Sequence, residues 1–377
     1  MKTILTLNAG SSSIRYALFD GEAGAAPCVP RCTGLLEGLG VGGASHADAL
    51  AGLLQQMGGE AITAVGHRVV HGGTRFDGPA RVDGDALAGI EALSTLAPLH
   101  QPHNLAGLRA AMAAFPSVPQ VACFDTAFHR TMPEVHQRFA LPQALHDRGI
   151  RRYGFHGLSY ASIAQQLQQA APALAAGRVV VAHLGNGASM CALQGGRSVA
   201  TTMSFSPLDG LPGGTRCGRL DPAVVLHLMR QEGMSADAVE HLLARQSGWL
   251  GLSGLSSDMR RLLASETPAA QLAVEHLVEH ILRELAALAA ALRGLDALVF
   301  TGGVGENAVA IRQRVLEGAA WLGLQGDDAA NQRGHGCITS AASPVAAWVL
   351  RTNEEAVIAQ QTLQVLQGVP GTMPASH

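Results

Sequence analysis

Residues 3–19 read TILTLNAGSSSIRYALF, and this stretch decides the fold. Thr3–Leu7 is short and β-prone, Asn8–Ser13 forms a turn, and Ile14–Phe19 resumes the strand. Small side chains in the turn let backbone N–H groups and serine hydroxyls approach an anion. The stretch therefore predicts a β-hairpin whose bend suits a phosphate, although an ordinary turn explains it equally well by itself. It is not a Walker P-loop, because the G-x4-G-K-[ST] order is absent and a strand follows.

The same arrangement recurs about 175 residues later in the chain. Val179–Leu184 predicts a strand, Gly185–Ala188 a bend and Ser189–Leu193 a second strand. A third glycine loop, Gly302–Asn307, follows a strand at Leu298–Phe300 and is expected to enter a helix, whose N-terminus favours nucleotide contact. Two matching hairpins predict an α/β chain with two lobes built on one plan.

Helices are expected between and after these hairpins. Asp221-Pro222 predicts a helix start with Asp as N-cap, and Thr352-x-x-Glu355 predicts a capping box for a last helix that ends near Leu366. Gly294 is expected to follow the C-terminus of a helix over Ala273–Arg293. Apolar residues on one face of that helix are Leu277, Ile281, Leu285, Leu288 and Leu292.

Length and composition limit the protein class. With 377 residues the chain is long enough for about two domains. Apolar residues make up 47%, and the mean hydropathy is +0.18, so a sizeable core is expected. The net charge of −3 argues against binding to nucleic acid or a membrane surface, and no apolar run is long enough to span a bilayer. Six scattered cysteines favour free thiols in the cytoplasm.

Isolated cationic and imidazole side chains lie next to glycines. Arg68 lies in GHRVVHGG, Arg216 in GGTRCG and His156 in YGFHG, while His100 and His183 add two more imidazoles. The planar guanidinium group suits carboxylates and phosphoryl oxygens. A lone arginine is usually a surface charge and a lone histidine is usually structural, so none of these residues carries a function by itself.

A competing motif is His276-Leu277-Val278-Glu279-His280, which spells the H-x-x-E-H pattern of inverted zinc peptidases. Two histidines at i and i+4 on a helix can bind zinc. However, charged residues on the outer face of a leucine-striped helix explain the spelling without a metal. We treat this motif as a weak alternative, because short motifs match by chance.

Together these segments resemble the acetate kinase family, which includes propionate kinases, of the sugar kinase/Hsp70/actin superfamily. The resemblance runs through nearly the whole chain in one order. It covers LNAGSSSIRYALF (7–19), GHRVVHGG (66–73), APLHQP (97–102), FDTAFHRTMP (124–133), RRYGFHGLSY (151–160), VAHLGNGAS (181–189), SFSPLDGLPGGTRCG (204–218), GLSGLSSDMR (251–260), VFTGGVGEN (299–307) and TNEE (352–355).

The resemblance implies a two-lobed, actin-like ATPase fold of the ribonuclease H-like type. Each lobe would have a βββαβαβα core, with the active site in the cleft between the lobes. The lobes would comprise residues 1–127 with 354–377, and residues 128–353. The implied activity is reversible phosphorylation of acetate by ATP, with Mg²⁺ or alternatively Mn²⁺, in a cytoplasmic homodimer. Alternatives are a propionate or butyrate kinase and, less favoured, an actin/Hsp70-like ATPase without an acyl substrate.

The resemblance also assigns roles to individual residues. Asp125, His156, Arg68 and Arg216 would be catalytic, and Asn8 and Glu354 would support the metal. The acceptor pocket would comprise Arg68, Val70, Leu99, His100, Phe155 and Pro207. The nucleotide site would comprise Ser11, Ser13, Arg15, His183, Leu184, Gly185, Asn186, Gly187, Asp258, Met259, Arg260, Gly303, Val304, Gly305, Glu306 and Asn307.

Three positions depart from the family pattern. Arg15 stands where a lysine is usual, and Cys217 and Arg219 stand where serine and aspartate are expected. The exchange at Arg219 predicts an added positive charge near the acyl site. Because a carboxylic acid is already ionised at neutral pH, no base is needed to create the nucleophile. We therefore expect Asp125 to act mainly through the metal or its waters.

Overall fold

The computed structural model describes residues 2–10, 13–21, 29–39, 43, 45–56 and 60–368, with the side chains of 54–56 left out. The chain divides into two compact units. Unit 1 comprises Met1–Arg130, Gly157–Ser162 and Asn353–His377, and unit 2 comprises Thr131–His156 and Ile163–Thr352. The short segment Gly157–Ser162 therefore packs with unit 1, although the sequence analysis placed it in the second lobe.

The sheet of unit 1 has the strand order β3-β2-β1-β4-β6-β5. β1 and β2 form the expected antiparallel hairpin, with Asn8 opposite Arg15, so that Asn8 lies within β1 and not in the turn. β4 is parallel to β1, and β6 is parallel to β4. The strands are β1 (Lys2–Ala9), β2 (Ser13–Gly21), β3 (Cys32–Glu37), β4 (Ile62–Val69), β5 (Ala80–Arg81) and β6 (Gln120–Phe124).

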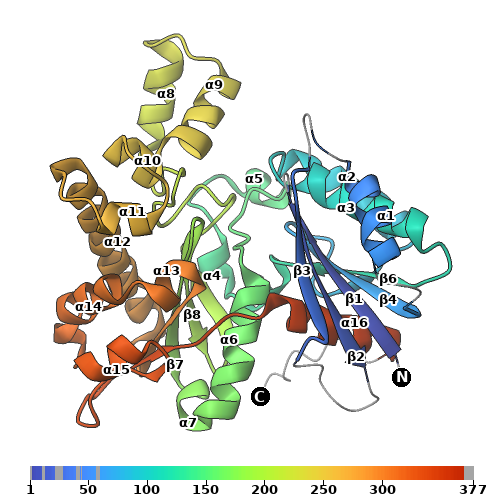
Figure 1. Cartoon of the computed structure of the whole chain (residues 1–377). Coiled ribbons are helices and arrows are strands. Elements are labelled where there is room, and N and C mark those ends of the chain that lie inside the picture. Colours follow the sequence, from blue (N-terminus) through green and yellow to red (C-terminus); the bar gives the residue numbers. More distant parts are fainter. Residues whose placement is uncertain are drawn as a thin grey trace. The chain divides into compact units, whose positions relative to one another are not determined.

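Helices cover both faces of this sheet (Figure 1). Successive side chains of a strand point to opposite faces, and in β1 both sets are buried. Leu5 packs in a cluster with residues of α1 (His46–Gln56) and α3 (Gln101–Ala114). Ile4 packs with residues of α16 (Glu354–Leu366). Buried on both sides, the first hairpin is the centre of the unit 1 core.

The sheet of unit 2 repeats this plan with the order β11-β12-β10-β7-β8-β9. β7, β8 and β9 are antiparallel neighbours, whereas β10 and β12 continue from β7 in parallel. The duplicated core is therefore confirmed. The strands are β7 (Arg178–Leu184), β8 (Ala188–Gln194), β9 (Arg197–Thr201), β10 (Ala297–Thr301), β11 (Gly336–Cys337) and β12 (Ala346–Val349).

The longest helix, α12 (Pro268–Leu292), packs its leucine stripe into the unit 2 core, as predicted. The residue with left-handed backbone at its C-terminus is Arg293 (φ 58°), one position before the expected Gly294. The other helices are α2 (Gly84–Ala92), α4 (Glu134–Gln137), α5 (Gln143–Asp147), α6 (Gly157–Ala170), α7 (Pro172–Ala175), α8 (Pro222–Arg230), α9 (Ala236–His241), α10 (Gly248–Ser253), α11 (Met259–Leu263), α13 (Gly302–Asn307), α14 (Val309–Gly318) and α15 (Asp328–Arg333).

The helix starts test the predicted caps. Asp221 caps α8 through the backbone N–H of Ala223, as expected. The predicted capping box of α16 is wrong, because the cap is Asn353, which accepts from the N–H of Ala356. Within the described residues, no helix combines the length and the apolar character that crossing a membrane requires.

Candidate active site

In unit 1 the strand ends gather a charged cluster around Arg68. The Nε and Nη2 atoms of Arg68 bind the carboxylate of Asp125, with the shortest distance 2.7 Å. Its Nη1 donates to Oδ1 of Asn8 at 3.2 Å, and its Nε lies 4.0 Å from the carboxylate of Glu354. Four residues singled out from the sequence thus meet at one place, because β1, β4 and β6 are neighbours in the sheet.

Burial and charge oppose each other in this cluster. Asp125 is 1% exposed. Burial raises the pKa of Asp125, and the adjacent Arg68 guanidinium opposes that rise. For Arg68, burial works against the charged form, but the charges of Asp125 and Glu354 outweigh it and raise its pKa. The hydrogen bonds from Arg68 to Asp125 fix the orientation of the guanidinium group, whereas the metal-mediated role expected for Asp125 stays a prediction.

The first turn of α6 closes the cluster on another side. Ser159 donates from its hydroxyl to Oε1 of Glu354. A Cβ at Gly157 would overlap the carbonyl oxygen of Asp125, so only glycine lets α6 begin here. Ser159 was not identified as a functional residue, although it lies in the quoted segment 151–160.

The neighbouring residues of the first hairpin are less tightly held. Ser13 begins β2, and its carbonyl accepts from the N–H of Gly10 at 2.8 Å. Arg15 is 63% exposed, and its Nη1 lies 3.9 Å from the carboxylate of Glu355, whose pKa is raised by burial. Ser11, which the sequence assigns to the phosphates, lies outside the described residues.

Two polar side chains of α3 hold the segment after β4. Asn104 accepts from the N–H of Val70 at 3.0 Å and donates to the carbonyl of Ala9 at 2.8 Å. Gln101 binds both the N–H and the carbonyl of His71. The sequence analysis missed Asn104 and Gln101. Their signal was two polar residues on the buried face of a helix that begins just after Leu99 and His100.

In unit 2 an imidazole lies beside the second glycine bend. His156 has left-handed backbone (φ 57°), which is costly for a residue with a Cβ. Its Nδ1 lies 2.8 Å from Oγ of Ser189, and its ring centroid lies 4.4 Å from that of His183. A Cβ at Gly187 would lie 3.5 Å from Nε2 of His156 and 3.2 Å from Nη1 of Arg216. His156, His183 and Arg216 therefore lie close together beside the second glycine bend, and their shared function stays a prediction.

Glycines 213 and 214 make the backbone of Arg216 fit beside that bend. Gly214 donates to the carbonyl of Asn186 at 2.8 Å, and Gly213 donates to the carbonyl of Arg216 at 3.0 Å. A Cβ at Gly214 would overlap Oδ1 of Asn186. This close approach explains the glycine pair before Arg216 without any ligand.

The third glycine segment differs from its prediction. Gly302–Asn307 is itself a helix, α13, and not a loop before one. Gly302 has φ 78°, and a Cβ there would lie 2.8 Å from the carbonyl of Leu184. Oε1 of Glu306 accepts from the N–H groups of Gly302 and Thr352, at 3.0 and 3.3 Å. The carboxylate of Glu306 therefore stabilises the start of its own helix.

Some of the other residues predicted to contact the nucleotide are exposed, and others are buried. Asp258 caps α11 and pairs with Arg260 at 2.7 Å on the surface. The side chains of Met259 and Leu184 lie in the unit 2 core. Only the backbone of those two positions is available to a ligand.

The charge of Arg219 is engaged by a neighbour. Its Nη2 lies 2.9 Å from Oε1 of Glu284 in α12, and burial raises the pKa of that carboxyl. Glu284 thus offsets part of the charge of Arg219, and the effect of this exchange on the acyl site stays a prediction. Burial likewise raises the pKa of the Cys217 thiol.

In the zinc-like motif the two histidines, His276 and His280, contact each other. The rings of His276 and His280 stack with centroids 4.0 Å apart, and Nδ1 of His280 lies 2.8 Å from the carbonyl of His276. Among the described residues, no group of three or more His, Cys, Asp or Glu side chains is placed to hold a metal ion.

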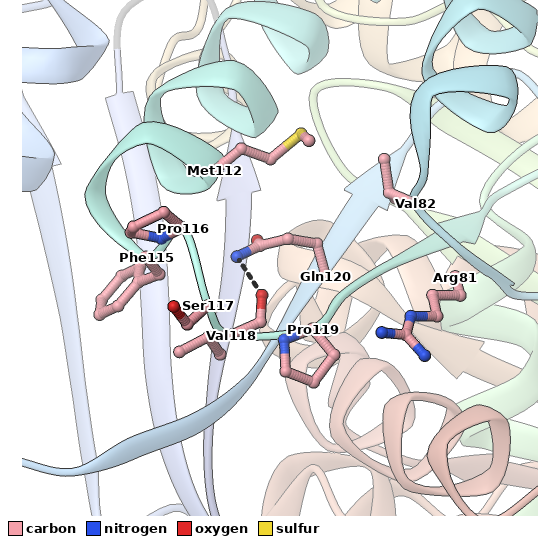
Figure 2. Close-up of a pocket in the computed structure, with 9 residues that line it drawn as sticks. All are labelled: Arg81, Val82, Met112, Phe115, Pro116, Ser117, Val118, Pro119 and Gln120. Carbon is pink, nitrogen blue, oxygen red and sulfur yellow. Dashed lines mark hydrogen bonds between the residues drawn. The ribbon is translucent and has the colours of Figure 1, made fainter.

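Figure 2 shows a pocket of about 180 Å³ in unit 1 that is lined in part by Gln120. Gln120 begins β6, and Asp125 follows the other end of that strand. Gln120, the first residue of β6, donates to the carbonyl of Val118 at 3.2 Å and binds His67 at 2.7 Å. Among the described residues that line it, Arg81 alone has an ionisable side chain. This pocket therefore contains none of the predicted site residues.

Known proteins resemble this chain over most of its length. Residues 41–360 match the acetokinase family. The chain is 50% identical to an acetate kinase of Methylocella silvestris over 97% of this chain and 98% of that protein. A propionate kinase structure from Francisella tularensis matches with a TM-score of 0.88 at 36% identity, covering 97% of this chain and all of that one. Porphyromonas gingivalis acetate kinase matches over the same shares with a TM-score of 0.87 at 35% identity.

These matches confirm the actin-like, two-lobed ATPase fold that the duplicated hairpins predict. They extend through both units and include the segments that carry Arg68, Asp125, His156 and Arg216. The chain belongs to the acetokinase family.

Proposed function

We propose that this chain is an acetate kinase, which reversibly transfers a phosphoryl group from ATP to acetate and forms acetyl phosphate. The observation that carries the proposal is its 50% identity to an acetate kinase over 97% of the chain. The charged cluster at Arg68 and the Arg216–His156 group supply the cations and donors that such a reaction needs.

The physical task is to bring two anions within bonding distance. Acetate is ionised at neutral pH, so its oxygen is already a nucleophile, and the main barrier is repulsion from ATP. Arg68 and Arg216 bind the carboxylate and the transferring phosphoryl group in this proposal. His156 donates a hydrogen bond from Nε2 to the charge that develops on the phosphoryl oxygens. Asp125 holds the Arg68 guanidinium in place.

The donor set in unit 1 fits a hard divalent cation. Mg²⁺ is commonly bound by one or two protein oxygens, with water and phosphate completing its shell. Asn8 Oδ1 and the Glu354 carboxylate are the proposed ligands, and Mn²⁺ is the alternative ion. When bound, the ion would offset the negative charge of the phosphates. Ser159 and Arg68 orient the Glu354 carboxylate for that purpose.

The nucleotide is assigned chiefly to unit 2. The bend at residues 183–187, the exposed pair Asp258–Arg260 and α13 are the proposed contacts of ATP, through backbone groups where side chains are buried. Ser11, Ser13 and Arg15 of the first hairpin are proposed to contact phosphates.

Propionate and butyrate are the alternative acceptors, and the likeness to a propionate kinase structure keeps them in consideration. We propose that Val70, Leu99, His100, Phe155 and Pro207 line the acceptor site. A branched Val70 leaves less room for the alkyl end than a smaller residue, which favours acetate. One methylene discriminates by only about 1–3 kcal/mol, so activity on acetate and propionate is expected to overlap.

The test traps acyl phosphate with hydroxylamine after incubation with ATP, Mg²⁺ and acetate, propionate, butyrate or no acid. The proposal requires a hydroxamate that depends on both ATP and acid, with the highest kcat/KM for acetate. ATP hydrolysis that ignores the acid would support an actin/Hsp70-like ATPase instead. Peptidase activity that a zinc chelator abolishes would support the metal motif at His276.

We further propose a cytoplasmic homodimer. α8 has none of its side chains buried, and Val224, Leu226 and Met229 are each at least 40% exposed, which is unusual for a monomer surface. Sedimentation of the wild type tests for a dimer, and sedimentation of a Leu226→Glu variant tests whether α8 forms its interface. A wild-type monomer, or a variant that remains dimeric, would contradict it.

A further inference from the structure

A buried hydroxyl lies behind His156 and has no role in the proposed reaction so far. Ser189 belongs to β8, is 0% exposed, and its Oγ lies 2.8 Å from Nδ1 of His156. Ser189 is also the cross-strand partner of His183, whose ring lies against that of His156. Two paired residues of the second hairpin, Ser189 and His183, thus both contact the His156 imidazole.

The two nitrogens of the His156 ring face different surroundings. Nδ1 faces Ser189, whereas Nε2 faces Gly187, where Nη1 of Arg216 also lies. The hydrogen bond that one ring nitrogen makes decides which tautomer the other presents. A hydroxyl that donates to Nδ1 leaves the proton on Nε2, and Nε2 then points a donor at the glycine bend.

We propose that Ser189 is a positioning residue that holds His156 in the Nε2–H tautomer, directed at the bend that carries Gly187. This inference rests on the proposed function for its effect on catalysis, because it assigns the orientation of the donor used there. It does not make Ser189 a catalytic residue, since Ser189 reaches the reaction only through the imidazole. The left-handed backbone of His156 sets the direction of its side chain, and the contact of Nδ1 with Ser189 sets the orientation of the ring.

The tautomer is measured directly by NMR on protein labelled with ¹⁵N-histidine, at the alkaline limit of the His156 titration. The His156 signals are assigned by their loss in His156→Asn. We expect a protonated Nε2 and an unprotonated Nδ1 in the wild type, and a shift of both signals in Ser189→Ala. A protonated Nδ1 in the wild type, or unchanged signals in Ser189→Ala, would overturn the proposal.

Kinetics supply the second readout. Ser189→Ala is expected to lower kcat by roughly 10- to 100-fold, with the KM for ATP changed less than about twofold, because misorientation of one donor acts on the transition state. In the His156→Asn background the same change should have no further effect. Ser189→Thr keeps the hydroxyl and should restore most of kcat. An additive loss in the double variant, or full activity of Ser189→Ala, would overturn the proposal.

Ser198→Ala is the matched control. Ser198 is 1% exposed in β9 of the same sheet, its hydroxyl lies 3.3 Å from Sγ of Cys191, and it pairs with Leu193, four residues along β8 from Ser189. It should leave both the NMR signals and kcat unchanged, and a loss equal to that of Ser189→Ala would show a merely structural effect. If the wild type forms no acyl phosphate, the proposed function fails, whereas the tautomer measurement still decides the role of Ser189.

Discussion

Unit 1 and unit 2 carry the same strand order, but the side chains beside their hairpins differ in kind. In unit 1 Arg68, Asp125 and Glu354 form a network of ionised groups. In unit 2 the bend at Gly187 faces imidazoles and one guanidinium, and glycines set the distances. The two units thus share a scaffold but differ in their polar groups: charged side chains bind one another in unit 1, and glycines allow the backbone to approach closely in unit 2.

The largest effect is expected from breaking the charge network of unit 1. Arg68→Met leaves the carboxylate of Asp125 buried without its partner, so we expect a loss of about 3–5 kcal/mol in the free energy of unfolding. Loss of one transition-state cation should also lower kcat by roughly 10²–10³-fold. Denaturant unfolding and acyl-phosphate assays measure the two effects.

Arg109→Met is its control in the same unit. Arg109 pairs with Glu91 at 2.8 Å, but both side chains are more than half exposed, so the expected cost is about 0–1 kcal/mol. Equal costs for Arg68→Met and Arg109→Met would remove the distinction between a buried network and a surface ion pair.

The corresponding test in unit 2 alters spacing instead of charge. In Gly214→Ala the new Cβ would displace the side chain of Asn186, so we expect a KM for ATP raised by about tenfold and a stability loss of about 1–3 kcal/mol. Gly84→Ala serves as control, because a Cβ there meets nothing within 4 Å. A normal KM in Gly214→Ala would mean that Asn186 is not needed at this position.

Acid is expected to weaken unit 1 through two buried histidines. Burial lowers the pKa of His67 and of His71 to about 4, from an ordinary value of 6.5. Between those pH values the unfolded chain binds protons that the folded chain does not, so the free energy of unfolding falls as the pH drops from 6.5 towards 4. His67→Gln should reduce that fall by about half, since two residues share it.

Thermal unfolding across this pH range measures the effect, and the exposed His227→Gln variant is the control. Identical pH profiles for His67→Gln and the wild type would contradict the assignment.

The smallest effect distinguishes two neighbouring residues, Thr352 and Asn353, just before α16. Asn353→Ala removes the side chain that caps α16 and should cost about 1 kcal/mol. In the described part of the chain the buried Oγ1 of Thr352 makes no hydrogen bond, so Thr352→Val should change stability by less than about 0.5 kcal/mol. Denaturant unfolding that ranks these two variants in reverse would restore the capping box predicted from the sequence.

The spacing of apolar residues and the residue types in the turns were enough to predict the main elements of the scaffold. The hairpins β1–β2 and β7–β8, the buried stripe of α12 and the Asp221 cap all follow from residues close together in the chain. Such features depend on local backbone preference and on the spacing of apolar side chains, which a sequence displays directly.

Local reasoning failed where a distant group competed for the same atoms. The carboxylate of Glu306 accepts hydrogen bonds from the N–H groups of Thr352 and Gly302, and the segment expected to be a loop is the helix α13. Glu284, 65 positions away from Arg219 in the chain, pairs with a charge that the sequence left unpaired.

The sequence by itself determined the two-lobed α/β plan, the family and a set of residue types that suit an anion. Only the tertiary structure decided which of them touch: that Arg68 binds Asp125, that Asn104 holds the backbone of Val70, and that Ser189 supports His156. The physical reason is that strand order brings together atoms that are far apart along the chain, and hydrogen bonds act only at contact distance.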